Sequence, residues 1–127
     1  MGVSRAYKLR LIQADIDLAK SAYEKGYYEM AIFHCQQAIE KSLKLLLEEK
    51  AGKYVRTHDL MFLRDLVGEF EEIRELLLDD EFLDRLEEGY FYGRYWDKPI
   101  EPFEDFEVQK AIYLAEEIFK RIKGLLG

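Results

Sequence analysis

Two long helical patterns with almost no chain between them constrain the fold of this sequence more than any other feature. In residues 4–25, apolar side chains recur every three or four positions, and the same spacing continues through residues 28–51. Only Gly26 and Tyr27 separate the two stretches. Each predicted helix is about 33 Å long at 1.5 Å per residue, so a connection this short makes the two an antiparallel pair.

The ends of both helices carry the expected signals. Ser4 is a predicted N-cap, because its hydroxyl can accept a hydrogen bond from a free amide of the first turn. Gly26 and Gly52 stand where the patterns stop, as is typical of the glycine after a helix. The predicted core positions are Leu9, Ile12, Ile16, Ala19 and Tyr23 in the first helix, and Ala31, Cys35, Ala38, Ser42 and Leu45 with Ile32, Ile39, Leu43 and Leu46 in the second.

The second half of the chain is also predicted to be helical, in shorter pieces. Glycine and proline interrupt it at Gly68, Pro99 and Pro102, because proline has no amide donor and restricts the residue before it. The predicted pieces are a helix capped by Thr57 or Asp59 and ending near 67, a helical turn at 71–78, a helix from Asp79 or Asp80 into the aromatic residues at 90–96, and a last helix at 104–125.

No segment shows the alternation of a strand, so the predicted fold class is all-α. We expect an up-and-down antiparallel bundle of four to five helices in which residues 1–127 form a single domain. A chain of 127 residues with 49% hydrophobic content is long enough to bury a core.

Charge is unevenly distributed along the chain. Residues 69–107 hold 15 acidic and 4 basic side chains, whereas the whole chain has a net charge of -7. Because affinity for duplex DNA depends on neutralising phosphates, we expect no duplex DNA binding. The sequence has no long uncharged apolar run and one cysteine, which predicts no membrane segment and a reducing, cytoplasmic location. The absence of asparagine favours a thermophilic source.

The sequence does not support metal binding, cofactor binding or a catalytic triad. Glu-x-x-His pairs that would bind two irons are missing, since Ala31 and Val55 precede His34 and His58 by three positions. Neighbouring side chains on a helix diverge by about 100°, so His34 and Cys35 cannot chelate one ion. Cys35 lies on the predicted buried stripe, where a thiol is unreactive. We therefore predict no metal, no cofactor and no catalytic residue.

Three stretches carry the remaining functional signal. The first, QQAIEKSLK at 36–44, includes Lys41 and Lys44 at spacings typical of surface pairs with Gln37 and Glu40. The second, THDL at 57–60, holds His58 beside two residues that favour helix starts. The third, YFYGRYWDKP at 90–99, places Arg94 among five aromatic residues. Without further information, each stretch is equally consistent with a purely structural role, Arg94 being then an ion-pair anchor.

Together these stretches resemble the HEPN domain family, in particular small prokaryotic HEPN proteins. Such domains carry an aromatic and small pattern with "QQA-EK--K", here Tyr28, Ala31, Gln36, Gln37, Ala38, Glu40, Lys41 and Lys44. They often continue with "THDL", here residues 57–60, and with a tyrosine four residues before "RY", here Tyr90, Arg94 and Tyr95. The resemblance extends over residues 4–125.

The resemblance implies a helical bundle that usually forms a homodimer. Many HEPN domains are partners of small nucleotidyltransferases in toxin–antitoxin pairs, and others are metal-independent RNases. The RNases use an arginine followed four to six residues later by a histidine, but no histidine follows Arg94 here. Whether the chain is an enzyme is thus left open, with a non-catalytic role favoured.

The leading hypothesis is a non-catalytic HEPN protein that binds a nucleotide or another phosphate-bearing ligand, including RNA, or a nucleotidyltransferase partner. Its predicted ligand-binding residues are Arg94, Tyr95, Trp96, Tyr90, His58, Lys41 and Lys44, with Arg94 on a phosphate and Tyr95 or Trp96 stacked on a base. Two alternatives remain. One is an endoribonuclease in which His58 replaces the missing histidine, and the other is a structural dimeric interaction protein.

Overall fold

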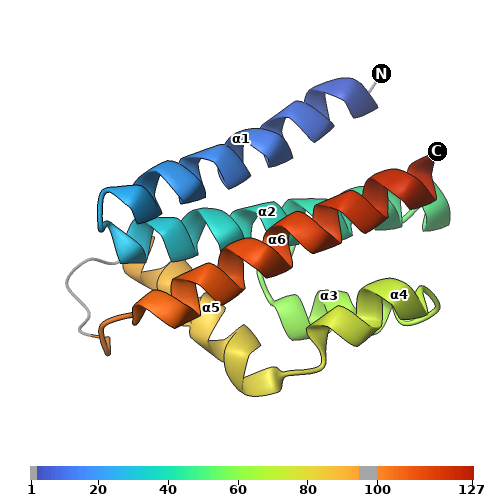
Figure 1. Cartoon of the computed structure of the whole chain (residues 1–127). Helices are drawn as coiled ribbons and strands as arrows, with labels where there is room; N and C mark the ends of the chain where they lie inside the picture. The colour runs from blue at the N-terminus through green and yellow to red at the C-terminus, as the bar shows by residue number, and fades with distance from the viewer. Residues whose placement is uncertain (1–2, 95–99) are drawn as a thin grey trace.

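The computed structural model describes residues 3–94 and 100–127, and at residues 92–94 it describes the backbone alone. In the described part of the chain every regular element is helical, as predicted (Figure 1). The elements are α1 (Arg5–Glu24), α2 (Tyr28–Ala51), α3 (Leu60–Leu66), α4 (Glu71–Arg74), a 3-10 turn η1 (Glu75–Leu77), α5 (Asp80–Arg94) and α6 (Asp105–Leu126). The all-α prediction is confirmed.

Helices α1 and α2 form the predicted antiparallel hairpin. Ser4 caps α1, and its hydroxyl accepts a hydrogen bond from the amide of Tyr7 at 3.2 Å. Gly26 and Gly52 have φ values of 77° and 64°, a left-handed conformation that costs glycine little because it has no Cβ. The residues that end the two helices could therefore be identified from the sequence.

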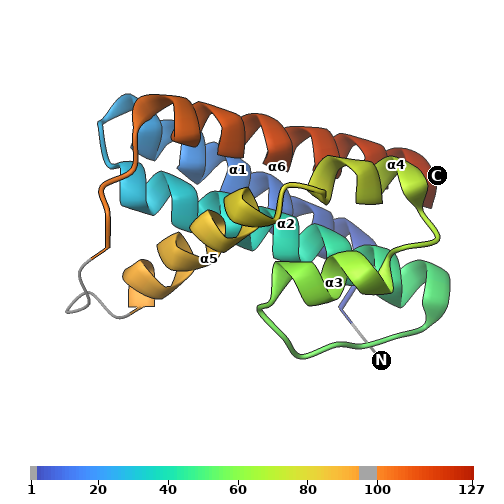
Figure 2. The ribbon, with the colours of Figure 1, turned by 90° about the horizontal axis from the view of Figure 1, so that it is seen from below.

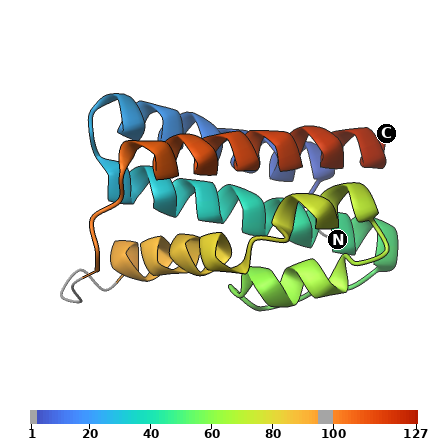
Figure 3. The same ribbon diagram turned by 60° about the horizontal axis from the view of Figure 1, so that its bottom comes forward.

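Helix α2 is the central element of the bundle and packs against α1, α3, α5 and α6 (Figures 2 and 3). All nine predicted core positions of α2 are buried, which explains why two adjacent stripes of this helix are apolar. In α1 the predicted positions Ile12, Ile16 and Ala19 are buried, while Leu9 and Tyr23 are partly buried at its ends. Cys35 is fully buried, and burial raises the pKa of its thiol far above the ordinary value.

The segment between α2 and α5 contains more short helical elements than predicted. The expected turn at 71–78 becomes α4 followed by the 3-10 turn, so the described elements exceed the predicted four to five helices. Asp59 caps α3, since its carboxylate accepts hydrogen bonds from the amides of Met61 and Phe62, and Thr57 supports it by accepting from the Asp59 amide. Asp79 accepts from the amide of Phe82 at 3.1 Å and so opens α5.

A close helix contact fixes the position of α5 against α2. Gly89 is buried, and a Cβ placed on it would lie 2.1 Å from Cγ2 of Ile32. No side chain larger than hydrogen fits there, so the two helices approach each other more closely than at an ordinary contact. The next residue of α5, Tyr90, is thereby held against the same surface of α2.

Helix α6 returns along α1 and α2 and completes the bundle. Glu104 and Glu107 form a capping box at its start, in which each side chain accepts a hydrogen bond from the other residue's amide. The carboxylate of Asp105 accepts hydrogen bonds from the hydroxyls of Tyr23 and Tyr28, both at 2.8 Å, and ties α6 to the α1–α2 turn. Within residues 3–94 and 100–127, no helix is both long and apolar enough to cross a membrane.

Candidate functional site

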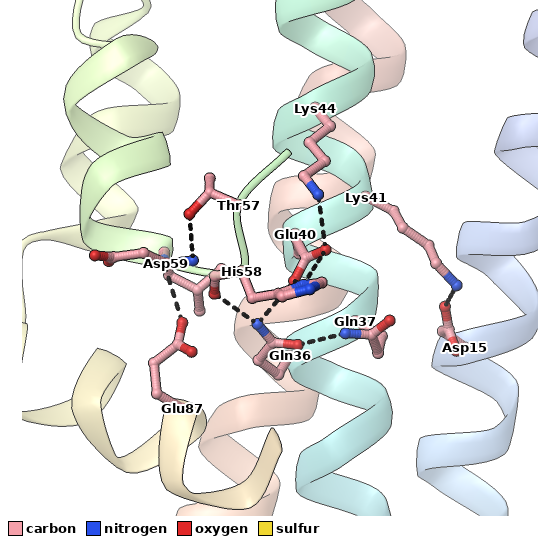
Figure 4. A network of polar contacts seen from close by, with 11 residues as sticks. Asp15, Gln36, Gln37, Glu40, Lys41, Lys44, Thr57, His58, Asp59 and Glu87 are labelled. Carbon is pink, nitrogen blue, oxygen red and sulfur yellow. Dashed lines mark hydrogen bonds and ion pairs between the residues drawn. The ribbon is translucent and has the colours of Figure 1, made fainter. Parts of the chain in front are cut away.

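Glu40 is the centre of a polar cluster on the side of α2 that faces the following loop (Figure 4). Its side chain is only 5% exposed. Its oxygens accept hydrogen bonds from Gln36 Nε2 at 3.1 Å and from Lys44 Nζ at 3.0 Å, and one of them lies 3.0 Å from Nδ1 of His58. Residues four apart share a helix face, so α2 presents Gln36, Glu40 and Lys44 in a row. We call these three residues and His58 the His58 cluster.

The loop before α3 is anchored so that His58 reaches Glu40. Gln36 Nε2 also donates to the backbone oxygen of His58 at 3.2 Å. On the other side, the amide of Leu60 donates to Oε1 of Glu87 on α5 at 2.9 Å. The position of His58 therefore depends on contacts from both α2 and α5.

A row of contacting rings extends from this cluster across α2. The imidazole of His58 stacks on the ring of Tyr90 with centroids 4.8 Å apart. Tyr90 in turn stacks almost parallel on Phe33 at 5.9 Å, and Phe33 meets His34 edge to face at 5.2 Å. Tyr90 is 4% exposed, whereas the His58 side chain is 53% exposed. Tyr90 thus supports the inner face of His58 and leaves much of the imidazole open to solvent.

A second carboxylate has the same kinds of partner on the opposite side of α2. Asp15 of α1 contacts His34 Nδ1 at 3.0 Å and Lys41 Nζ at 2.6 Å, and its side chain is 9% exposed. Burial acts to raise the pKa of Asp15, but the hydrogen bonds with His34 and Lys41 outweigh it and hold this pKa below the ordinary value. We call Asp15, His34 and Lys41 the Asp15 cluster. Figure 4 shows Lys41 extending toward α1 while Lys44 lies over Glu40.

Glu87 is the most perturbed carboxyl group near the His58 cluster. Burial raises its pKa to about 7, although the hydrogen bonds with the Leu60 amide and Gln36 oppose the shift. The nearby charges of Asp59 and Glu40 add to the increase. Glu87 therefore changes charge near neutral pH, close to the anchor of the His58 loop.

The contacts indicate which nitrogen of His58 carries the proton, and they give the net charge of the two clusters. A carboxylate only accepts hydrogen bonds, so Nδ1 carries the proton toward Glu40, and Nε2 of the neutral ring is an acceptor. No hydrogen-bond partner for Nε2 occurs among the described residues. Lys41 and Lys44 each face one carboxylate, so with neutral histidines the two clusters together carry no net charge. An anion would need a further cation to bind here tightly.

The predicted ligand-binding residues fall into three groups. His58, Lys44 and Tyr90 come together in and beside the His58 cluster, while Lys41 belongs to the Asp15 cluster. Arg94 is the last residue of α5, one turn after Tyr90, and its side chain lies outside the described residues. Tyr95 and Trp96 lie wholly outside them. The expected Gln37–Lys41 pair is not formed, because Gln37 donates to Gln36 and Lys41 reaches Asp15 instead.

Sequence reasoning did not single out Asp15, Phe33 or Glu87. Asp15 stands directly before Ile16 on the buried side of α1, where a carboxylate without a partner would be costly, and that position was a usable signal. Glu87 likewise follows the buried Leu86 and precedes Tyr90 by three positions. No group of three or more His, Cys, Asp or Glu side chains in the described part of the chain is placed to hold a metal ion.

A family model and a solved structure each match nearly the whole chain. Residues 10–125 match the sequence model of the HEPN domain. The crystal structure of an archaeal HEPN homologue resembles this chain with a TM-score of 0.73 and 25% sequence identity, covering 98% of this chain and 100% of that one. No curated protein matches the sequence.

Proposed function

Because the chain belongs to the HEPN domain family, we propose that it is a non-catalytic HEPN protein that binds a phosphate-bearing ligand such as a nucleotide. The observation that carries the proposal is the His58 imidazole, which is stacked on Tyr90, fixed by Glu40 and open to solvent on its outer side. A flat ring held in this way is suited to stacking on a nucleobase.

Arg94 is proposed to supply the missing positive charge. It ends α5 one turn after Tyr90, and a guanidinium can form two parallel hydrogen bonds with a phosphate. Lys44 adds a second cation, since only one of its three N–H donors is used by Glu40. Tyr95 and Trp96 follow directly in sequence and are the further residues proposed to stack on the base.

Calorimetric titration of the full chain with a nucleoside triphosphate tests this proposal. We expect His58→Ala and Arg94→Lys each to weaken binding about tenfold, with little change in melting temperature for Arg94→Lys, because lysine cannot form the planar fork. His34→Ala is the control for loss of an imidazole that contacts neither Glu40 nor Tyr90, and it should weaken binding much less than His58→Ala. Absence of heat and of any melting shift with the wild type would refute ligand binding and favour Arg94 as an ion-pair anchor.

The second candidate function is a metal-independent endoribonuclease. The Glu40–His58 pair favours it, because a carboxylate that orients an exposed imidazole is a common general acid–base arrangement. The sequence lacks the histidine that RNases of this family place after Arg94. We expect the purified protein to leave single-stranded RNA intact; cleavage that is lost in both Arg94→Ala and His58→Ala, with folding preserved, would establish the nuclease instead.

A nucleotidyltransferase partner is compatible with the same site. Family membership supports this role, and a small nucleotidyltransferase encoded by the neighbouring gene would be the most informative observation. Co-expression of the two proteins followed by size-exclusion chromatography measures complex formation. Separate elution of the two proteins at micromolar concentration would remove the partner role and leave the nucleotide titration unaffected.

A further inference from the structure

A cavity of about 180 Å³ lies between α1 and α2, and its lining is mostly apolar. Its floor contains Ile12 and Leu45, which are 1% and 3% exposed, and Leu11 stands at its edge with 40% exposure. Apolar cavities of about 150 Å³ can hold a benzene molecule, so this space accommodates one aromatic ring or a short aliphatic chain. We call it the α1–α2 groove.

Three lysines line the same groove. Lys8, Lys41 and Lys44 line the groove, and their side chains are partly exposed, at 31%, 39% and 21%. Each lysine contacts one carboxylate, at 2.7 Å to Glu48, 2.6 Å to Asp15 and 3.0 Å to Glu40. An ammonium group has three donors, so each lysine can bind a further acceptor without losing its present partner.

Hydrogen-bond donors around the groove, and not a net positive charge, favour an anion. Glu48 lines the groove with the three lysines, and Asp15 and Glu40 pair with two of them, so three carboxylates match the three ammonium groups. Asp15 and Glu40 are not among the residues that line the groove; their side chains are 9% and 5% exposed, and each also contacts a histidine. A ligand in the groove would thus meet lysine N–H donors above an apolar floor.

We propose that the α1–α2 groove binds a small amphipathic anion, with a phosphate or carboxylate head on the lysines and a compact apolar body over Leu11, Ile12 and Leu45. This site is distinct from the nucleotide surface at His58 and shares only Lys44 with it. It does not depend on the function proposed above. The neighbouring carboxylates limit the affinity, because the lysines are already neutralised in part.

A methyl NMR titration of the full chain with phenyl phosphate tests the groove. We expect shifts of the Leu11, Ile12 and Leu45 methyl groups, and an affinity at least about fivefold higher than for inorganic phosphate, which cannot bury apolar area, or for benzyl alcohol, which has no charge. Hexanoate in a parallel titration distinguishes an aliphatic from an aromatic body. Absence of shifts at Leu11, Ile12 and Leu45 would overturn the proposal. A second copy of the chain that already fills the groove would also prevent these shifts, and the proposal would then be wrong as well.

Paired variants of α1 locate the site. Leu11→Glu should abolish phenyl phosphate binding, whereas Leu18→Glu, a comparably exposed position two turns later on the same helix, should not. Lys8→Gln should weaken binding several-fold because it leaves Glu48 facing the ligand, while Lys20→Gln, whose partner is Glu116, should have no effect. Equal affinity of Leu11→Glu and wild type would contradict the assignment. His58→Ala should lose nucleotide but keep phenyl phosphate, which separates failure of this site from failure of the other.

Discussion

Individual residues around α2 combine charge and burial in a way that ordinary surface residues do not. Asp15 and Glu40 are nearly buried carboxylates, and each is compensated by one lysine and one histidine. Burying a charge is unfavourable unless its partners are close, so these side chains specify where α1, α2 and the loop before α3 meet. Glu87 differs, because burial and the nearby charges of Asp59 and Glu40 raise its pKa to about 7.

Replacement of Glu87 by glutamine should change how stability depends on pH. In the unfolded chain a glutamate has a pKa near 4.5, so between about pH 4.5 and 7 the folded protein binds more protons and loses stability as the pH rises. Solvent screening of this half-buried group reduces the effect, and we expect a loss of about 1–2 kcal/mol over that interval. Glutamine keeps an acceptor for the Leu60 amide and should remove this dependence.

Urea denaturation of wild type and Glu87→Gln at pH 5 and pH 8 measures the difference. The variant should match the wild type at pH 5 and exceed it at pH 8, because only ionised Glu87 is unfavourable in the folded state. Glu88→Gln is the matched control, since its side chain is 49% exposed and it pairs with Arg85 on the surface. Parallel pH profiles of the wild type and the variant would contradict the raised pKa of Glu87.

At the scale of elements, the contact between α2 and α5 places Tyr90 beside His58. Gly89 permits that contact because a larger side chain would overlap Ile32. The stack of His58, Tyr90 and Phe33 then joins the loop, α5 and α2 through rings from all three. The geometry of the candidate site therefore depends on one glycine that does not belong to it.

Gly89→Ala should destabilise the protein by about 1–3 kcal/mol, the usual effect of overpacking a core. It should also displace α5 and weaken nucleotide binding at His58. Gly124→Ala is the matched control, because a Cβ there meets no atom within 4 Å and alanine favours a helix by up to about 1 kcal/mol. Thermal and urea denaturation measure both variants.

Ile32→Ala in the Gly89→Ala background completes the test of that contact. It removes the methyl group that clashes, so the double variant should be more stable than the sum of the two single changes predicts. Strict additivity would mean that α5 avoids the clash in another way.

At the scale of the whole molecule, ion pairs connect the acidic segment to the rest of the bundle. The acidic segment of residues 69–107 is tied to α3 and α6 by basic side chains: Arg64 pairs with Asp80, Lys110 with Asp79, and Arg121 with Glu75. Arg85 within the segment binds Glu107 at 2.9 Å and lies over the ring of Phe103. Such networks agree with the composition that favours a thermophilic source, which stays a prediction.

The protein is expected to be a homodimer that buries more than about 1,000 Å² in total. Exposed apolar side chains support this expectation, among them Leu18 at 51%, Met30 at 43% and Phe91 at 50% exposure. Light scattering should give twice the chain mass of 15.1 kDa. A mass equal to that of a single chain at every accessible concentration would exclude the dimer. In that case Leu18→Glu and Met30→Glu should have the same mass as the wild type.

Much of the fold follows from the sequence alone because its signals are local. Apolar spacing identified α1, α2 and α6, and the ends at Ser4, Gly26 and Gly52 depend on the chemistry of a single residue and its backbone. The division of residues 71–78 into α4 and a 3-10 turn was not predicted, since short elements carry too few apolar repeats to define a period.

The candidate site depended on contacts between residues far apart in the sequence. Helix spacing placed Glu40 beside Lys44, but only the folded chain brings His58 to Glu40, Tyr90 to His58 and Asp15 to Lys41. A sequence gives the type and spacing of charged residues, and their partners are decided by which helices pack together. That packing is set by features such as the fit of Gly89 against Ile32, because steric overlap at one position determines how closely two helices approach.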